Sequence, residues 1–296
     1  MGRFDHLIGT EMSRGTWSWT PERAMLYAVG VGAGQQDATQ ELQFTTENTA
    51  GLPQQVIPSF LSLMTTGKPW MKPLAFETRD WGGGLEWDWP RGMVHGEQGV
   101  SLHRPLPASG EVEVSLVLAG VYDKGSGALV IADQNIRLKD SGELLGTARA
   151  GFFVRGQGGF GGPRTPPDEP DWSEPGRAPD ATVVMATAPN QSLIYRLSGD
   201  HNPHCTDPAR ARADGFERPI LQGMGTYGFA CRALLQALCG GEVARFGAMH
   251  ARISQPLYPG EILETLMWRT PAGAQFRTVT STGKVVLDRG GFTYAA

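Results

Sequence analysis

The residues best suited to chemistry stand together in one stretch, YRLSGDHNPHCTDP, which covers residues 195–208. Its candidate side chains are Asp200, His201, Asn202, His204 and Cys205. A carboxylate, an imidazole and a thiol can each accept or donate a proton, so the stretch suits general acid–base catalysis. Ser198, Asp200 and Asn202 are also common in turns that precede helices. Asp200 taken alone favours the turn, and the surrounding chain is needed to decide.

Composition limits the chemistry that the chain can support. The 296 residues are 40% hydrophobic and 19% charged, which is typical of a globular protein with an ample core. A net charge of -4 predicts no general attraction to nucleic acid or to an anionic membrane. The start, MGRFDHLIGTEM, lacks the apolar run of a secretory signal, and no segment approaches the roughly 20 apolar residues that a bilayer requires. We therefore expect a cytoplasmic location and no membrane partner.

Cysteine spacing argues against a metal site. The three cysteines, Cys205, Cys231 and Cys239, form no CxxC pair. Paired spacing is the usual sign of a structural zinc site, and an even, regularly spaced set is the usual sign of a disulfide framework. We expect a reducing compartment and no bound metal.

A stretch rich in Gly, Pro and acidic residues separates two units of similar size. Residues 156–179 carry little apolar surface, and their glycines and prolines disfavour both helix and strand. We interpret them as a linker. Residues 1–155 and 180–296 then form an N-terminal and a C-terminal domain.

Both units are expected to contain one main helix and several antiparallel strands. In the first, TPERAMLYAVGVGAG has Thr20 as N-cap and Pro21 at the first helical position, and strands are predicted over residues 111–122, 128–140 and 143–156. In the second, a short helix precedes a long one that ends at Gly240 and Gly241. The strands predicted in the second unit cover residues 248–254, 261–269, 276–281 and 284–287. This recurrence predicts a repeated α+β fold.

Two further local predictions concern the candidate motif and a faint internal repeat. The residues from Tyr195 read as a strand that breaks at Ser-Gly-Asp. GMVHGEQG (residues 92–99) and ILQGMGTYG (residues 220–228) each contain a Gly-bearing turn at which a helix could begin.

The second unit resembles the MaoC-like, (R)-specific enoyl-CoA hydratase family. The motif of that family runs Tyr-Arg-Leu-Ser-Gly-Asp-x-Asn-Pro-Leu-His-x-Asp-Pro and continues Gly-Phe-x-x-Pro-Ile-Leu-His-Gly. Here the two parts stand as YRLSGDHNPHCTDP and GFERPILQG. WTPERAMLYAVGVGAG, MVHGEQ, LHRPLPASGEV, FFVRGQGGFGG, PLYPGEILETLMW and VVLDRG extend the resemblance to two-part members of the family over nearly the whole chain.

The resemblance implies a double hot-dog fold, in which each half is a long helix wrapped by an antiparallel sheet. It also implies an active site in the C-terminal half and an N-terminal half that shapes room for the acyl chain. In agreement, nothing similar to Gly-Asp-x-Asn-Pro occurs before residue 199. The implied reaction adds water to a trans-2-enoyl-CoA to give a (3R)-hydroxyacyl-CoA, or runs in reverse as a dehydration. The substrate would be an acyl-CoA thioester, no separate cofactor is expected, and a homodimer is one possible assembly.

Carried over by position, the resemblance gives roles to three residues. Asp200 matches the catalytic aspartate, and Asn202 matches the asparagine that helps to orient the water. Gly223 lies at the expected start of the long helix, where free N–H groups and the helix dipole can receive the thioester oxyanion. Without the motif, Gly223 would be interpreted as a glycine that serves helix packing only.

The chain departs from the motif at its histidines. The catalytic histidine position is Cys205, His204 stands where the family has leucine, and the second histidine is replaced by Gln222. Three interpretations compete: His204 or His201 takes over the proton transfer, Cys205 itself serves, or hydration is slow or absent. A thiol pKa of about 8.5 matches an aspartate near 4 poorly. We rank altered or weakened hydration, with Asp200 as the only strong base, above a role limited to binding.

The CoA-binding residues and the alternative functions have less support in the sequence. Arg155, Arg164 and Arg245 are candidates for contacts to the CoA phosphates. The alternatives to hydration are a catalytically reduced acyl-CoA or acyl-carrier binding protein and a hot-dog thioesterase, because a fold alone does not determine a reaction.

Overall fold

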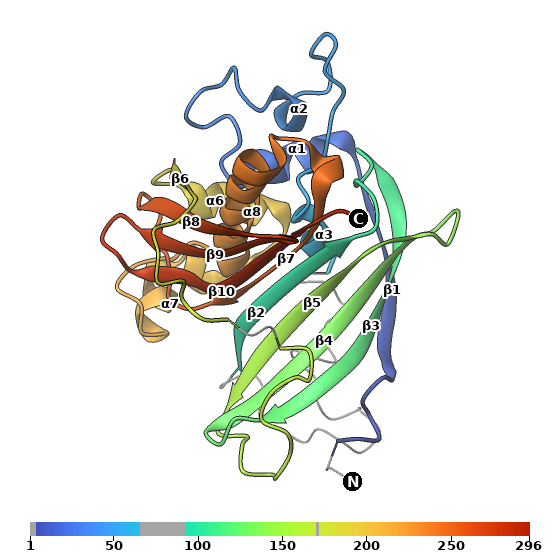
Figure 1. The fold of residues 1–296 in the computed structure, drawn as a ribbon, viewed down its shortest axis with the longest axis vertical. Coiled ribbons are helices and arrows are strands. Elements are labelled where there is room, and N and C mark those ends of the chain that lie inside the picture. The colour runs from blue at the N-terminus through green and yellow to red at the C-terminus, as the bar shows by residue number, and fades with distance from the viewer. Residues whose placement is uncertain (1–3, 66–92, 170–171) are drawn as a thin grey trace.

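The strands pair into one continuous sheet that includes both halves of the chain. In this computed structural model, the structure describes residues 4–65, 93–169 and 172–296. Within these ranges the strand order is β1-β3-β4-β5-β2-β7-β10-β9-β8-β6, and neighbouring strands are antiparallel. Figure 1 shows the sheet curving across the molecule, with β2 and β7 in its middle. The two halves are therefore joined by main-chain hydrogen bonds.

The same strand order occurs twice. The first half contributes β1 (Glu11–Trp19), β2 (Met93–Leu102), β3 (Gly110–Asp123), β4 (Gly127–Leu138) and β5 (Leu144–Arg155). The second half contributes β6 (Ala181–Ala186), β7 (Phe246–Ile253), β8 (Ile262–Thr270), β9 (Gly273–Thr280) and β10 (Val285–Tyr294). From edge to centre the first half runs β1-β3-β4-β5-β2, and the second half runs β6-β8-β9-β10-β7. Each strand of one half thus has a counterpart at the same place in the other.

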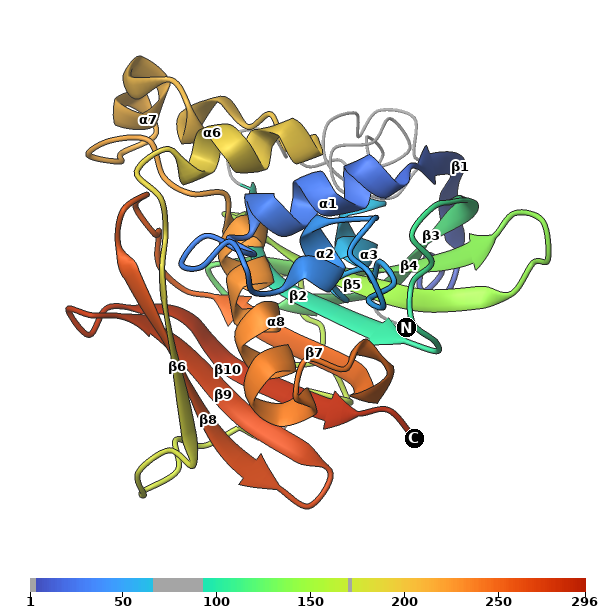
Figure 2. The same ribbon diagram turned by 90° about the horizontal axis from the view of Figure 1, so that it is seen from above.

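Helices cover one face of the sheet. They are α1 (Pro21–Gly30), α2 (Leu42–Thr45), α3 (Phe60–Leu63), α6 (Gln191–Tyr195), α7 (Pro208–Ala213) and α8 (Gly223–Cys239), with 3-10 turns η3 (Arg196–Ser198), η4 (Pro203–Cys205) and η5 (Val243–Arg245). Seen from above, α8 lies in the concave side of the second half, and α1 lies beside α6 (Figure 2). No helix in the described ranges is both long and apolar enough to cross a bilayer.

The predicted helix ends are confirmed. Thr20 is the extended N-cap of α1, with Pro21 after it, and Gly240 adopts a left-handed conformation (φ 65°) at the end of α8. Most of α8 is buried, because it forms the centre of the core. Gly228 lets α1 and α8 approach closely, since a Cβ at that position would lie 2.4 Å from Val31 Cγ1. The core is therefore shared between the two halves.

Two local predictions were wrong. Residues 93–99 begin no helix, because they belong to β2, which has hydrogen-bonded neighbours on both edges, β5 and β7. Tyr195 leads no strand, because it ends α6 and continues into η3. Tyr195 is 1% exposed and packs near Tyr27 of α1, with ring centroids 6.1 Å apart. Burial against a helix, with no neighbouring strand, decides its conformation.

The predicted strands are present, with shifted ends. β10 continues to Tyr294, beyond the predicted end at residue 287, through an irregularity in its register between Asp288 and Gly291. Two edge strands, β1 and β6, were not predicted. Division of the chain into separately folding domains at residues 155 and 180 stays a prediction.

Candidate active site

The candidate motif forms a compact turn between α6 with η3 and the largely exposed α7. The chain leaves η3 through Gly199, whose φ of 112° suits glycine and disfavours other residues, and then reaches Asp200. Beyond it, η4 leads to Asp207, which caps α7 by accepting a hydrogen bond from the N–H of Ala209 at 2.8 Å. Gly199 therefore sets the direction in which the carboxylate leaves the helix.

Asp200 makes the turn contact expected from the sequence, and its role in proton transfer stays a prediction. Its Oδ1 accepts a hydrogen bond from the N–H of Asn202 at 3.2 Å, which is the predicted turn contact. Its pKa is raised, mainly because burial disfavours the charged form, although the Asn202 N–H, His204 and His201 act in the opposite direction. A carboxyl group whose pKa is raised by burial accepts a proton more readily, and holds it more strongly, than an exposed carboxyl group.

Asn202 lies next to this carboxylate through its backbone. The residue is exposed, and its main-chain N–H makes the contact with Asp200. Its proposed role in orienting water stays a prediction.

Cys205 is a buried neutral thiol. Its exposed fraction is 1%, and burial followed by the charge of Asp200 raises its pKa well above the usual range for cysteine. A thiol whose pKa is raised is a poor base at neutral pH, because the thiolate is scarcely populated. The environment of Cys205 favours a packing role.

His204 is held by other partners. Its Nδ1 lies 3.1 Å from Oδ2 of Asp214, and its ring meets the edge of the Phe216 ring, with centroids 5.3 Å apart. Arg210 donates to the same Asp214 oxygen at 2.9 Å. His201 is exposed. Among the described residues neither histidine is hydrogen-bonded to Asp200, and His204 is directed to Asp214 at the end of α7.

We expect His204→Leu to change the turnover of an enoyl thioester by no more than a few fold. The substitution removes a side chain that contacts Asp214 and Phe216 while leaving the Asp200–Asn202 turn in place. Steady-state kinetics of the purified variant would check this, with Asp214→Asn as the matched control for loss of the same contact. A fall of 10²-fold or more in kcat for His204→Leu alone would make His204 the moved catalytic group.

Gly223 begins α8, as predicted. The first helical N–H groups of α8 have no acceptor within the helix, so they can receive a negatively charged oxygen. A Cβ on Gly223 would lie 3.1 Å from Cδ1 of Ile253, at the end of β7. The missing Cβ therefore leaves room for the Ile253 side chain, and the role of Gly223 toward a thioester carbonyl stays a prediction.

Gln222 links the helix start to the turn, a contact that sequence reasoning did not anticipate. Its Nε2 donates to the carbonyl oxygen of Ser192 at 3.2 Å and to that of Asp200 at 3.4 Å. The side chain is 2% exposed, and its Oε1 has no hydrogen-bond partner among the described residues. The only signal in the sequence was the departure from the histidine of the motif.

The three candidate arginines are not brought together with Asp200. Arg245 follows the C-terminal end of α8, and Gly223 begins the same helix of 17 residues. A helix of this length extends about 25 Å, so the two positions lie at its opposite ends. Arg155 ends β5, and Arg164 is exposed in the segment that follows it.

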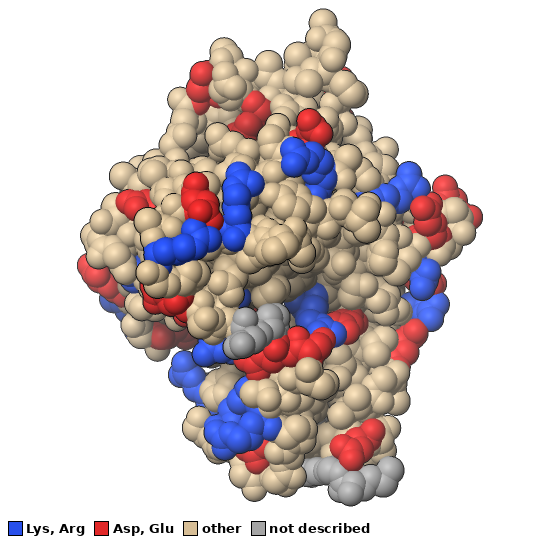
Figure 3. Space-filling model, viewed as in Figure 1, with Lys and Arg blue, Asp and Glu red and all other residues tan. Residues whose placement is uncertain are grey.

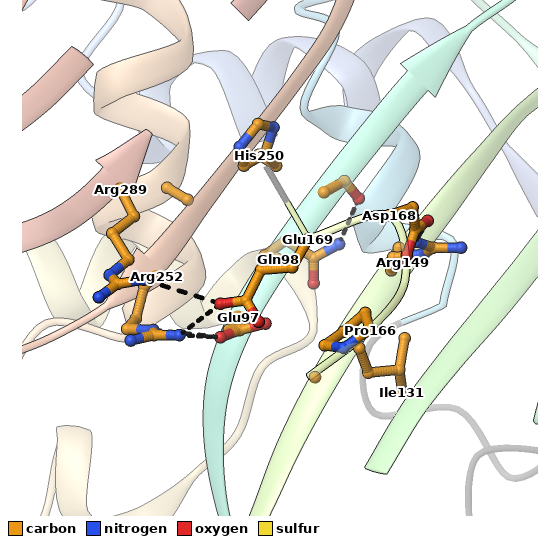
Figure 4. Close-up of a pocket in the computed structure, with 13 residues that line it drawn as sticks. Glu97, Gln98, Ile131, Arg149, Pro166, Asp168, Glu169, His250, Arg252 and Arg289 are labelled. Carbon is orange, nitrogen blue, oxygen red and sulfur yellow. Dashed lines mark hydrogen bonds and ion pairs between the residues drawn. The ribbon is translucent and has the colours of Figure 1, made fainter. Parts of the chain in front are cut away.

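A second hollow lies on the outer face of the sheet, where basic and acidic side chains meet in the middle of the view in Figure 3. It encloses about 250 Å³ between β2, β5, β7 and residues 166–169. Arg252 pairs with Glu97 at 2.8 Å, and Arg149 pairs with Asp168 (Figure 4). None of the predicted site residues lines it. Arg252 of β7 also pairs with Glu169 at 3.7 Å, which ties residues 166–169 to the seam between the halves.

Comparison with known proteins gives the family. The MFE-2 hydratase 2 N-terminal domain model matches residues 17–156, and the MaoC like domain model matches residues 171–289. The chain is 41% identical to 3-hydroxyacyl-thioester dehydratase Y of Mycobacterium tuberculosis, over 98% of this chain and 97% of that protein.

Solved structures agree with these matches. A MaoC-like dehydratase from Phytophthora capsici has a TM-score of 0.85 and 30% identity, covering 100% of this chain and 98% of the other. A Mycobacterium tuberculosis protein described as having a double hotdog fold has a TM-score of 0.55 and 14% identity, covering 99% of this chain and 97% of the other. The predicted α+β double hot-dog fold is confirmed. The chain belongs to the two-part MaoC-like family, with a hydratase 2 N-terminal half and a MaoC-like C-terminal half.

Proposed function

We propose that the protein is an (R)-specific enoyl-CoA hydratase, which adds water to a trans-2-enoyl-CoA and catalyses the reverse dehydration of a (3R)-hydroxyacyl-CoA. The observation that carries this proposal is the partly buried Asp200 carboxyl, whose pKa is raised, on a turn that Gln222 links to the N-terminus of α8. The related dehydratase that matches almost the whole chain supports the same reaction class.

In this proposal Asp200 carries both proton transfers. The carboxylate takes a proton from water as the water oxygen bonds to C3 of the enoyl group. The electron pair of the C2–C3 double bond moves toward the thioester carbonyl, giving an enolate. The protonated Asp200 then donates to C2 on the same face, the carbonyl re-forms, and Asp200 returns to the carboxylate. One group on one face gives syn addition, and no histidine is required.

The raised pKa of Asp200 suits this double use. Burial makes the carboxylate a stronger base toward water. The raised pKa also favours the protonated carboxyl group, which donates to C2 in the next step. Water itself remains a weak acid, so a single carboxylate without an imidazole partner should be slower than the complete pair. The chemistry moves protons and changes no overall oxidation state, so the mechanism that we propose needs no metal or redox cofactor.

The N-terminus of α8 would stabilise the enolate. A backbone N–H at Gly223 can donate to the developing oxyanion, and the positive end of the helix dipole adds to this effect. Removing one such donor typically costs about 10²–10³ in kcat. Gly223 permits the approach, because no side chain stands between the carbonyl and the main chain.

A screen of short, long and ring-bearing enoyl-CoAs tests the function. Hydration should lower the absorbance of the enoyl thioester without releasing thiol. Release of free thiol would instead indicate a thioesterase, and binding with neither signal would indicate a binding protein. The cytoplasmic location and the possible homodimer stay predictions.

The pH dependence of kcat/KM should distinguish one proton-transfer group from two. Because Asp200 must begin ionised, activity should fall as pH decreases through its raised pKa, above the usual range near 4. No second limb is expected between pH 5 and 8, since the buried thiol of Cys205 stays protonated there. A bell-shaped profile in this range would contradict the single-group mechanism.

A further inference from the structure

The guanidinium of Arg23 connects the N-terminal half to the turn that carries Asp200. Arg23, in the first turn of α1, donates from Nη1 to the carbonyl oxygen of Leu197 at 3.1 Å and from Nη2 to that of Ser198 at 2.7 Å. The two acceptors belong to η3, which ends one residue before Gly199. One planar guanidinium thus holds the two consecutive carbonyls that precede Gly199 and Asp200.

These carbonyls need a partner from outside their own helix. The last carbonyls of a helix have no N–H donor within it, and a cation at this end is favoured by the helix dipole. A guanidinium has several donors in a fixed plane, so it can restrain both the position and the orientation of the two peptide groups. The contact fixes the peptide that leads into the left-handed Gly199.

A second contact aligns the same helices. Nε2 of the buried Gln191, in α6, donates to the carbonyl oxygen of Gly30 at 2.7 Å. Gly30 ends α1, and a Cβ there would lie 3.5 Å from both Ser198 Oγ and Tyr195 Cα. Contacts at both ends of α1 therefore place it along α6 and η3 (Figure 2).

We propose that Arg23 is a positioning residue for Asp200, so that the half without the catalytic motif holds the proton-transfer group in place. This inference rests on the proposed function. Arg23 contacts backbone oxygens and acts through the geometry of the turn. Small displacements of a reacting group are costly, since a 1 Å misplacement can reduce the rate by about 10²-fold.

The test compares Arg23→Ala and Arg23→Lys with Arg14→Ala. Arg14 is an arginine of the same half whose ion pairs with Glu11 and Glu113 lie on the surface. We expect Arg23→Ala to lower kcat by about 10²-fold with KM changed by only a few fold. Arg23→Lys should recover part of the loss, because one ammonium can reach one carbonyl. Arg14→Ala should match the wild type, and the acidic limb of the pH profile should not move in any variant.

Hydrogen–deuterium exchange provides a readout independent of turnover. Exchange of the amides of residues 196–202 should increase in Arg23→Ala and not in Arg14→Ala. Unchanged exchange and unchanged kcat in folded Arg23→Ala would overturn the inference, as would a fall in kcat fully explained by a smaller folded fraction. If the wild type hydrates none of the enoyl-CoAs, the proposed function fails, and increased exchange would still support Arg23 as the residue that fixes this turn.

Discussion

Asp200→Asn should lower hydration by at least about 10⁴-fold. Both proton transfers pass through this carboxyl in the proposed mechanism, and one well-placed acid–base group typically contributes about 10²–10⁴-fold. The amide keeps the shape of the side chain, and its oxygen can still accept from the N–H of Asn202. It cannot take the proton from water. The measurement is kcat with the best enoyl-CoA from the screen, together with the affinity for the same ligand.

The same variant should fold at least as well as the wild type. Burial raises the pKa of Asp200 in the folded state, so the ionised form is less favourable there than in the unfolded chain. The resulting penalty is absent at pH below the unfolded pKa of about 4 and grows as pH rises through the raised folded pKa. Asn removes the charge, so the Tm of Asp200→Asn should equal or exceed that of the wild type near pH 7. Turnover close to wild type would remove Asp200 as the base.

Cys205→His should raise hydration by about 10²–10⁴-fold, because it returns an imidazole to the position that the family motif reserves for one. The thiol at this position is buried, and Asp200 helps to raise its pKa, so an imidazole placed there would face the same reaction centre. A second titrating group should also add a descending or ascending limb near pH 6.5 to the pH profile. Both effects would be read from kcat/KM as a function of pH.

Space is the main obstacle to this substitution. Cys205 is 1% exposed, and overfilling a packed site commonly costs about 1–3 kcal/mol. The double variant His204→Leu with Cys205→His restores the Leu-His pair of the motif and provides a second test. Cys205→Ala is the matched control and should keep wild-type turnover to within a few fold. If folded variants that bear the imidazole gain nothing, the absent histidine does not limit the rate.

The turn that carries Asp200 could be predicted because the residues that shape it act locally. Gly199, Asp200 and Asp207 act within a few residues of themselves, as left-handed link, turn acceptor and helix cap. Gly240 ends α8 for a similar reason. Such positions need particular side chains or backbone angles, so residue type and spacing identify them.

Positions that depend on distant partners could not be predicted in the same way. β2 is a central strand because residues near 150 and 250 pair with its two edges, and its glycines suggested a turn. Arg245 lies at the opposite end of α8 from Gly223, and its contact with the CoA phosphates stays a prediction. Arg23 was not predicted because its partners are backbone carbonyl oxygens. Every residue has such an oxygen, so residue types do not identify the acceptors.

The repeated strand order has an evolutionary consequence. A single-sheet subunit with the order of β6-β8-β9-β10-β7 would expose its β7 edge, and an exposed strand edge recruits another strand. A second identical subunit meeting it across a two-fold axis would give the layout seen here. The chain thus has the architecture of an ancestral homodimer made covalent by gene fusion. Fusion frees the two copies to diverge, so one can retain the acid–base turn while a helix of the other, α1, specialises in supporting it.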